Sequence, residues 1–282
     1  MHESSLTVRN ISDTARWVAY FRARETERSD ALFHDPYAER LAGDLGFHIA
    51  NTLPEGNKHE WAWVARTYLF DKFLLEEIQK GADLVVNLAA GLDARPYRMD
   101  LPRTLQWVEV DLPEIISYKE EVLADETAKC RLERIPLDLS GLPERRKLFA
   151  DLERRAKKIV VVTEGLLIYF TEDEVGCFAR DLAAGNNFQS WIIDLASPGQ
   201  LKLMQRTTGQ QLSEAGAAFK FGPPEGPRFF VQHGWEPKDV QGLLKTAAEF
   251  NRAPKGLRPL NLDSNGAPGT FPWTGVCLLT KC

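Results

Sequence analysis

Two features in the middle of the chain have the residue types and the spacing to bind a nucleoside. An apolar run at 84–88 (LVVNL) ends in Ala-Ala-Gly, and a carboxylate, Asp111, follows twenty residues after Gly91. A buried strand that stops at a turn of small residues lets a ligand lie against bare backbone. A carboxylate at the end of the neighbouring parallel strand can accept hydrogen bonds from both hydroxyls of a ribose. The pair therefore predicts a nucleoside site on a doubly wound sheet.

The turn after this run distinguishes among three ligands of such sheets: a dinucleotide, flavin mononucleotide and S-adenosylmethionine. A pyrophosphate requires G-x-G-x-x-G, so that the amino terminus of a helix can meet it. Here Ala89 and Ala94 stand at the outer glycine positions, and Arg95-Pro96 adds bulk beyond them. S-adenosylmethionine carries no phosphate and needs fewer glycines, so the turn favours it, although ordinary strand-to-helix turns share this pattern.

Composition excludes several other classes. The 282 residues are 44% hydrophobic and 27% charged, which is typical of a globular chain with a full core. The formal net charge of −5 offers no basic surface to a nucleic acid. The start of the chain lacks the apolar stretch of a signal peptide, no apolar run is long enough to cross a bilayer, and the four cysteines are scattered. We expect a cytoplasmic protein with reduced thiols that binds neither nucleic acid nor membrane.

The elements that must position the site alternate after the first eighty residues. Helical patterns at Ser12–Arg24 and Ala62–Gln79 come first. Strand-like runs then follow at Leu84–Leu88, Gln106–Val110, Ile159–Thr163, Trp191–Leu195 and Gly275–Thr280. Helical segments at Pro113–Ala124, Pro143–Lys157 and Asp173–Ala183 separate them. This alternation predicts an α/β fold with a mostly parallel sheet covered on both faces.

The stretch from Ser197 to Arg228 breaks the alternation, with SPGQ at one end, FGPPEGP near the other and a helical centre around Leu201 to Phe219. Because it follows a strand at the edge where α/β sheets bind ligands, it could form a lid; a surface excursion without a role is the alternative. We predict one domain over 1–282, composed of a helical cap (1–80), a cofactor-binding core (81–196), this insertion (197–228) and the end of the sheet (229–282).

The order of several motifs resembles a known family. VVNLAAGLDARPYR is followed by WVEVDLPEIISYK, PLDL and VVVTEGLLIYF, as in the leucine carboxyl methyltransferase family of class I S-adenosylmethionine-dependent methyltransferases. The segment TARWVAYFRARETERSDALFHDPYAERL is similar to the opening of its bacterial O-methyltransferase branch. The resemblance runs from about Thr14 to the final strand. It implies a Rossmann-like, doubly wound sheet of seven strands with a helical cap and a lid insertion before the last two strands.

The resemblance also assigns cofactor-binding residues in the core. Gly91 would lie under the methionine part of S-adenosylmethionine, and Asp111 would bind the ribose hydroxyls. Asp138 would accept a hydrogen bond from the exocyclic amine of the adenine, Leu139 would contact its ring, and Glu164 would lie near the amino group of the cofactor. Taken singly, the two aspartates could instead only cap the helices that follow them.

Two arginines and two departures from the family pattern complete this set. Arg24 and Arg66 match the basic positions that hold the methionine carboxylate, which a planar guanidinium suits. Ala89 replaces the usual first glycine, and we expect the turn to survive if its φ is negative. Asn87 replaces an acidic residue and loses its charge, which leaves more of the binding of the cofactor's ammonium to Glu164.

Other interpretations of the charged residues remain open at this point. Arg24 lies in the run RARETER, which by itself is typical of a solvated helix face. Arg66 could pair with Glu60 or Asp71 on its own helix. Lys119 is expected to be a surface lysine.

The implied reaction requires little of the protein beyond alignment. The sulfonium of S-adenosylmethionine already activates its methyl group, so the enzyme must orient a nucleophile and exclude water. The sequence shows no paired acidic motif for magnesium, and we expect no metal. A carboxylate acceptor needs no base, whereas a phenol or enol does. Tyr169, in EGLLIYF, is our candidate for a catalytic residue that faces the acceptor, with Tyr20 a second one.

An enclosed apolar pocket, suggested by the aromatic-rich cap and the compact insertion, favours a small organic acceptor such as a polyketide-like secondary metabolite. Its reacting oxygen would belong to a hydroxyl or a carboxylate. The alternatives are a protein C-terminus as acceptor, as among the eukaryotic members of the family, a nicotinamide-dependent oxidoreductase, and a module that binds S-adenosylmethionine without catalysis. Hydrolysis is disfavoured because no strand-to-helix turn carries G-x-S-x-G.

Overall fold

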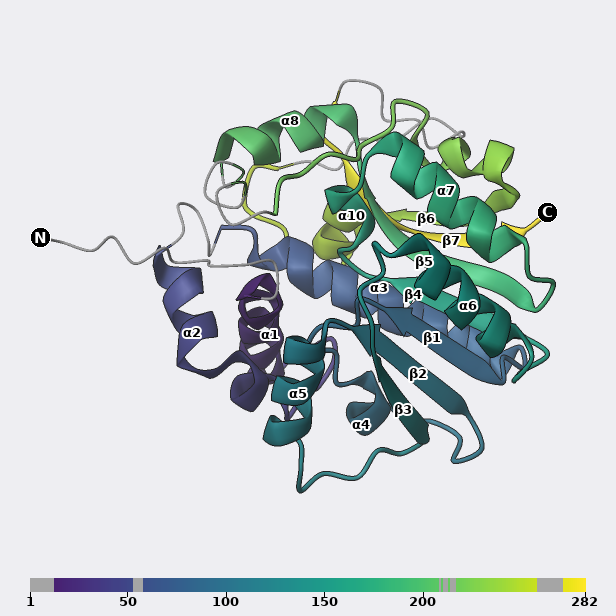
Figure 1. Cartoon of the computed structure of the whole chain (residues 1–282). Helices are drawn as coiled ribbons and strands as arrows, with labels where there is room; N and C mark the ends of the chain where they lie inside the picture. Colours follow the sequence, from purple (N-terminus) through teal and green to yellow (C-terminus); the bar gives the residue numbers. More distant parts are fainter. Residues whose placement is uncertain (1–12, 53–57, 208, 210–212, 214–216, 258–270) are drawn as a thin grey trace, which may run out of the picture.

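The computed structural model describes residues 13–52, 58–207, 209, 213, 217–257 and 271–282, and in this part of the chain one seven-stranded sheet forms the centre (Figure 1). The strands are β1 (Leu84–Leu88), β2 (Gln106–Asp111), β3 (Arg131–Pro136), β4 (Ile159–Thr163), β5 (Phe188–Ala196), β6 (Trp235–Gly242) and β7 (Thr274–Lys281). Their order is β3-β2-β1-β4-β5-β7-β6, and only β7 runs antiparallel to its neighbours. The predicted Rossmann-like α/β fold is confirmed.

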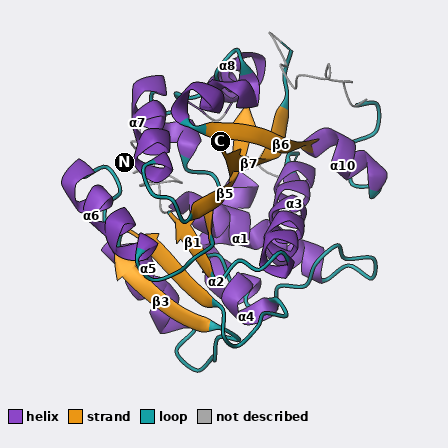
Figure 2. Cartoon of the chain, turned by 90° about the vertical axis from the view of Figure 1, so that its right-hand side faces the viewer, coloured by secondary structure: helices purple, strands orange, loops and turns teal. Residues whose placement is uncertain are grey.

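Helices cover both faces of the sheet. Figure 2 shows α6 (Leu142–Glu153) and α7 (Glu172–Ala183) on one side, and α3 (Glu60–Gln79) and α10 (Leu243–Glu249) on the other. The remaining helical elements are α1 (Asp13–Thr26), α2 (Ala38–Thr52), α4 (Arg95–Arg98), α5 (Pro113–Val122), α8 (Pro198–Thr207), and the 3₁₀ turns η1 (Leu167–Tyr169) and η2 (Gly226–His233). None of the helices in the described ranges is long and apolar enough to cross a bilayer.

The position of strand β1 explains why four of its five residues are apolar. All five of its residues are buried, because Leu84, Val86 and Leu88 face the core under α6 and α7. Val85 faces the second core, under α3 and α10. A central parallel strand with both faces covered requires this pattern.

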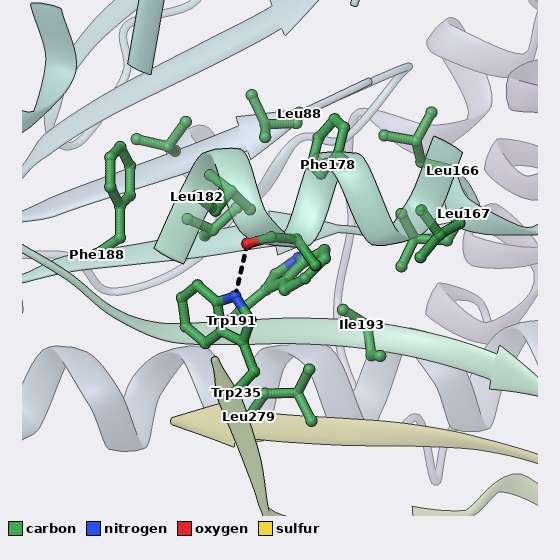
Figure 3. Packing of buried hydrophobic residues seen from close by; sticks show 14 of the residues in the cluster. Leu88, Leu166, Leu167, Phe178, Leu182, Phe188, Trp191, Ile193, Trp235 and Leu279 are labelled. Atoms are coloured by element: carbon green, nitrogen blue, oxygen red, sulfur yellow. Dashed lines mark hydrogen bonds between the residues drawn. The ribbon is translucent and has the colours of Figure 1, made fainter. Parts of the chain in front are cut away.

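The first of these cores is built around stacked aromatic rings. Phe178 of α7 stacks on Trp191 of β5, with ring centroids 6.0 Å apart, and Trp235 meets Trp191 edge to face (Figure 3). Both buried indoles have partners for their N–H groups: Trp191 donates to Thr163 Oγ1 at 3.0 Å, and Trp235 donates to the carbonyl of Ala179 at 3.0 Å. Both indole N–H groups are therefore hydrogen-bonded although the core around them is apolar.

Two strands that carry no apolar run were not expected at their positions. Strand β3 at one sheet edge is charged (RLERIP), with alternately exposed residues. Strand β6 at the other edge contains Pro237, beside a shift in its register with β7. Edge strands need only one buried face and tolerate proline, so their sequences lack the signal of a central strand.

The insertion after β5 also differs from the expectation. Its helix, α8, spans Pro198–Thr207, and residues 209 and 213 are also helical, but residues 217–223 form no helix, whereas a helical centre was expected to continue to Phe219. Residues 208, 210–212 and 214–216 of this expected helix lie outside the described residues. The apolar side chains of Leu201 and Met204 pack against Phe219 and the cap.

Truncating the stacked core should destabilise the fold. We expect Phe178→Ala, at a fully buried position, to lower the free energy of unfolding by about 3–5 kcal/mol, because transfer and cavity terms add. Chemical denaturation measures this change. Leu142→Ala, at a 44% exposed position, is the control and should change stability by less than about 0.5 kcal/mol. Equal losses in the two variants would contradict the assigned core.

Candidate functional site

A cavity of about 1120 Å³ lies at the carboxyl ends of β1, β2, β4 and β5, beneath α1 and α8. It brings together the predicted Tyr169 and eight of the nine predicted cofactor-binding residues: Arg66, Asn87, Ala89, Gly91, Asp111, Asp138, Leu139 and Glu164. Ligands of open α/β sheets bind at this edge. The sequence prediction therefore converges on one place in the fold.

The turn after β1 contains two residues with positive φ. Ala89 has φ of +54°, so the negative φ on which the survival of the turn was made conditional is not present, and an alanine occupies the left-handed region at a cost of about 1–2 kcal/mol. Gly91 also has positive φ, +50°. A Cβ atom on Gly91 would lie 3.3 Å from the Cβ of Ala15, so the glycine lets α1 approach the turn. The turn therefore contains backbone strain at Ala89, which the surrounding contacts must offset.

Asp111 is fixed by backbone donors. Its Oδ2 accepts from the N–H of Gly91 at 2.6 Å, and its Oδ1 accepts from the N–H of Leu112 at 2.7 Å. Burial raises the pKa of this carboxyl, while these two N–H groups act in the opposite direction. The N-cap of α5 is Leu112, with no side-chain bond, so capping does not explain the aspartate.

Asp138 and Leu139 form the next part of the wall. Asp138 is exposed, and its Oδ1 accepts from the N–H of Ser140 at 2.9 Å, whereas Leu139 is buried. The following helix begins at Leu142 without a side-chain cap. Asp138 therefore shapes a turn at the cavity and does not cap α6.

Arg66 crosses from α3 to the sheet. Its Nε donates to Glu164 Oε1 at 3.1 Å, and its Nη1 donates to Asp194 Oδ2 at 3.0 Å. Partners on its own helix, Glu60 or Asp71, are thus the wrong alternative. Gly165 has φ of +72°, and a Cβ there would come within 3.3 Å of Arg66 Nη1, so this turn needs a glycine.

Arg95 is a functional residue that the sequence reasoning treated only as bulk. It is buried, and its guanidinium donates to Asp71 Oδ1 at 2.6 Å, Asp93 Oδ2 at 2.8 Å and Glu164 Oε2 at 2.8 Å. Asn87 Nδ2 donates to the same oxygen of Asp93 at 2.8 Å. In the sequence, the only local sign of these ion pairs is that Asp93 and Arg95 carry opposite charges two residues apart.

The protonation states follow from this burial. Desolvation raises the pKa of the Asp93 carboxyl, but Arg95, Lys119 and Arg98 outweigh it and lower the pKa to about 2. Desolvation likewise opposes the charge of Arg95, but its carboxylate partners hold its pKa well above the ordinary value. These groups stay charged at neutral pH.

The network of ion pairs extends into the cap, where it includes Arg22 and not the predicted Arg24. Arg22 lines the cavity, with Nε 2.8 Å from Asp35 Oδ2 and Nη2 donating to the carbonyl of Leu92 at 2.6 Å. Arg24, which was predicted to hold a carboxylate, is 44% exposed, pairs with Glu60 at 3.3 Å and does not line the cavity. The two positions lie on different sides of α1, which local sequence spacing alone did not resolve.

The other half of the cavity wall is apolar and aromatic. It is contributed by Trp17, Trp63, Ile168, Tyr169, Leu203, Met204 and Phe219. The ring of Tyr169 stacks on Phe219 with centroids 5.7 Å apart, and its hydroxyl is hydrogen-bonded to Thr14. Burial raises the pKa of Tyr169. Tyr20, the second candidate, packs on Phe21 and Phe47 and is not among the lining residues.

Lys119 is not a surface residue. It is completely buried and donates to Glu109 Oε1 at 2.8 Å, while Arg134 pairs with the other oxygen at 2.9 Å. This group ties α5 to strands β2 and β3, behind Asp111. Its role is structural, because a fully buried lysine requires a paired carboxylate.

Sequence comparison identifies a family and several related proteins. The sequence profile of the leucine carboxyl methyltransferase family matches residues 15–182. A Frankia alni protein named "Putative S-adenosyl-L-methionine-dependent methyltransferase" is 32% identical over 265 residues, covering 86% of this chain and 89% of its own. A second Frankia alni protein of that description is 38% identical over 273 residues and covers 91% of each chain.

Solved structures show the same fold. A DUF574 family protein from Streptomyces avermitilis superposes with a TM-score of 0.64 at 12% identity, covering 95% of this chain and 97% of that one. A protein from Thermobifida fusca gives 0.59 at 16% identity, covering 99% and 97%.

Together with the fold, these matches identify the chain as an S-adenosylmethionine-dependent methyltransferase. More narrowly, the chain belongs to the leucine carboxyl methyltransferase family, as its motifs predicted.

The strained turn gives a prediction about stability. Ala89→Gly should raise the free energy of unfolding by about 0.5–1 kcal/mol, because the relief of left-handed strain exceeds the entropy that glycine adds to the unfolded chain. Ala90→Gly, next to it and without a positive φ, should lower stability by about as much. Denaturant titration of both variants measures the difference. The same sign for both would refute strain at Ala89.

Proposed function

We propose that the enzyme transfers a methyl group from S-adenosylmethionine to an oxygen, of a hydroxyl or a carboxylate, on a small organic acceptor such as a polyketide-like metabolite. One observation supports this most: a single cavity joins a polar half, lined by paired carboxylates and guanidiniums, to an apolar aromatic half. Its volume of about 1120 Å³ exceeds that of most sites for one small ligand.

The polar half fits the chemical groups of the donor. Each oxygen of Asp111 accepts one backbone N–H, which leaves lone pairs for two ribose hydroxyls. Glu164 supplies negative charge for an ammonium group, and Arg66 and Arg22 retain N–H groups for a carboxylate. The proposal therefore assigns the tail of the donor to the side of α1 and α3.

A dinucleotide fits this edge poorly. The helix after the β1 turn, α4, has only four residues, and proline occupies its second position. The side chain at its first position, Arg95, is committed to three carboxylates beneath the turn. A pyrophosphate would find no long helix whose amino terminus could stabilise it, which speaks against the oxidoreductase alternative.

The chain's own residues align the reactants and exclude water. When bound, the donor supplies a methyl group already activated by a sulfonium. The turn after β1 and the ion pairs of Arg66 hold one side of the cavity rigid. Helix α8 and Phe219 cover the apolar side, where bulk water would otherwise compete with the acceptor.

The decisive experiment is a transfer assay with isotopically labelled S-adenosylmethionine and a panel of small phenols, enols and carboxylic acids, read by mass spectrometry of the products. O-methylated small molecules are the expected result. Methylation of a peptide with a free C-terminal carboxylate, and of no small molecule, would favour the protein-directed alternative. Tight donor binding without any transfer would favour a non-catalytic module.

The contact between Asp111 and the donor can be tested by binding alone. Asp111→Asn should weaken the binding of S-adenosylmethionine by about 10- to 100-fold, since a hydrogen bond to a charged group contributes about 1.5–3 kcal/mol. Isothermal calorimetry measures the dissociation constant. Asp125→Asn, an exposed residue away from the cavity, should leave it unchanged. Equal affinities for the two variants would remove Asp111 from the site.

Tyr169 should act on the acceptor side. We expect Tyr169→Phe to lower kcat about tenfold without changing donor affinity, because the hydroxyl is lost from a buried wall while the ring stacked on Phe219 remains. Steady-state kinetics and calorimetry separate the two quantities. Tyr118→Phe, whose hydroxyl bonds to the carbonyl of Leu41 outside the cavity, is the control. Undiminished turnover would remove Tyr169 from the acceptor site.

A further inference from the structure

Asp194 is a carboxylate in the cavity that no sequence motif indicated. Building on the proposed function, we propose that Asp194 is the general base of the reaction and that the acceptor group is a neutral hydroxyl on an aromatic or similarly flat apolar molecule. This assignment decides between the two kinds of acceptor oxygen, a hydroxyl and a carboxylate, and names the residue that takes the proton.

The position of Asp194 suits a base. It lies near the end of β5, in a strand paired with β4 on one side and β7 on the other, so its backbone is rigid. Its side chain is 20% exposed and lines the cavity. Oδ1 accepts from the N–H of Gly165 at 2.7 Å, and Oδ2 accepts from Arg66 at 3.0 Å. Each oxygen keeps a lone pair that can receive a hydrogen bond from an acceptor hydroxyl.

The neighbouring charges distinguish Asp194 from Glu164. Glu164 accepts hydrogen bonds from two guanidiniums, those of Arg66 and Arg95, which neutralise it. Among the described residues, Asp194 accepts from one guanidinium, that of Arg66. A carboxylate with fewer cationic partners binds a proton more readily, so the geometry favours Asp194 as the proton acceptor.

Ionisable groups from four elements lie around Asp194. Arg66 comes from α3, Glu164 follows β4, Tyr169 belongs to η1, and Cys277 lies on β7. Burial raises the pKa of Asp194, Arg66 and the N–H of Gly165 oppose this, and Glu164 adds to it. A carboxylate whose pKa is raised takes a proton better than one in water.

The same geometry disfavours a carboxylate acceptor. A carboxylate is already ionised and needs no base. It would also approach Glu164 and Asp194 against like charge. A neutral hydroxyl avoids this repulsion, and the stacked rings of Tyr169 and Phe219 offer a flat apolar wall for its carrier.

The O–H bond of the acceptor breaks, and its proton passes to the carboxylate of Asp194. The oxygen forms a bond to the methyl carbon of the donor as the bond from that carbon to sulfur breaks. The electron pair of the broken bond stays on sulfur, which becomes a neutral thioether, and Asp194 later releases its proton to water.

The test uses 1-naphthol and 1-naphthoate, which share a ring system and differ in the reacting group. The wild-type enzyme should form the methyl ether of the first and no methyl ester of the second. Asp194→Asn keeps the size of the side chain and should lower kcat on 1-naphthol by about 10²- to 10⁴-fold at neutral pH. In the wild-type enzyme, kcat should fall at low pH as Asp194 becomes protonated; we call this fall the acid limb of the pH profile. In the variant the acid limb should be absent, and kcat should rise with pH only as the naphthol itself ionises.

Glu164→Gln is the matched comparison, because it removes the neighbouring carboxylate that also pairs with Arg66. It should weaken donor binding but keep the acid limb of kcat. An Asp194→Asn variant with the wild-type pH profile, or one that loses only donor affinity, overturns the assignment. A methyl ester as the wild-type product overturns it even if the variant does not fold, and leaves the proposed function standing. Absence of any O-methylated product across the whole panel defeats the proposed function itself.

Discussion

The buried guanidinium of Arg95 is the constraint on which the site depends. It can remain charged in the interior only if carboxylates surround it, and these come from three elements: Asp71 from α3, Asp93 from the turn after β1, and Glu164 from the end of β4. Removing one partner of such a group costs about 3–5 kcal/mol, because a charge is left uncompensated. The ion pairs therefore fix the relative positions of helix, turn and strand end more specifically than apolar packing would.

The same network determines what the cavity attracts. Five carboxylates face four guanidiniums in one connected set: Asp35, Asp71, Asp93, Glu164 and Asp194 with Arg22, Arg66, Arg95 and Arg98. The set carries one negative charge in excess. Because its members are largely buried, this charge acts more strongly than it would in water. A ligand with one net positive charge, such as a zwitterionic amino acid bearing a sulfonium, complements it, and this complementarity weakens once the sulfonium has lost its methyl group.

The two halves of the cavity place different demands on the chain. The polar half is built from strand ends and the turns that follow them, whose backbone is held by the sheet, and it can align charged groups closely. The apolar half comes from α1, α8 and Phe219, which meet through side-chain packing. Packing tolerates changes of shape better than paired charges do, so related enzymes can share the polar half while they accept different molecules in the apolar one.

The sequence by itself determined the central strands, the edge at which the cavity lies and nine of the residues that line it, because parallel strands that end in small or acidic residues bring them to one edge. Only the tertiary structure decided the partners of Arg66, which lie 98 and 128 residues away, the positive φ of Ala89 and the presence of Arg22 in place of Arg24. Local periodicity and spacing encode which element forms, whereas pairing between distant side chains depends on how the elements pack.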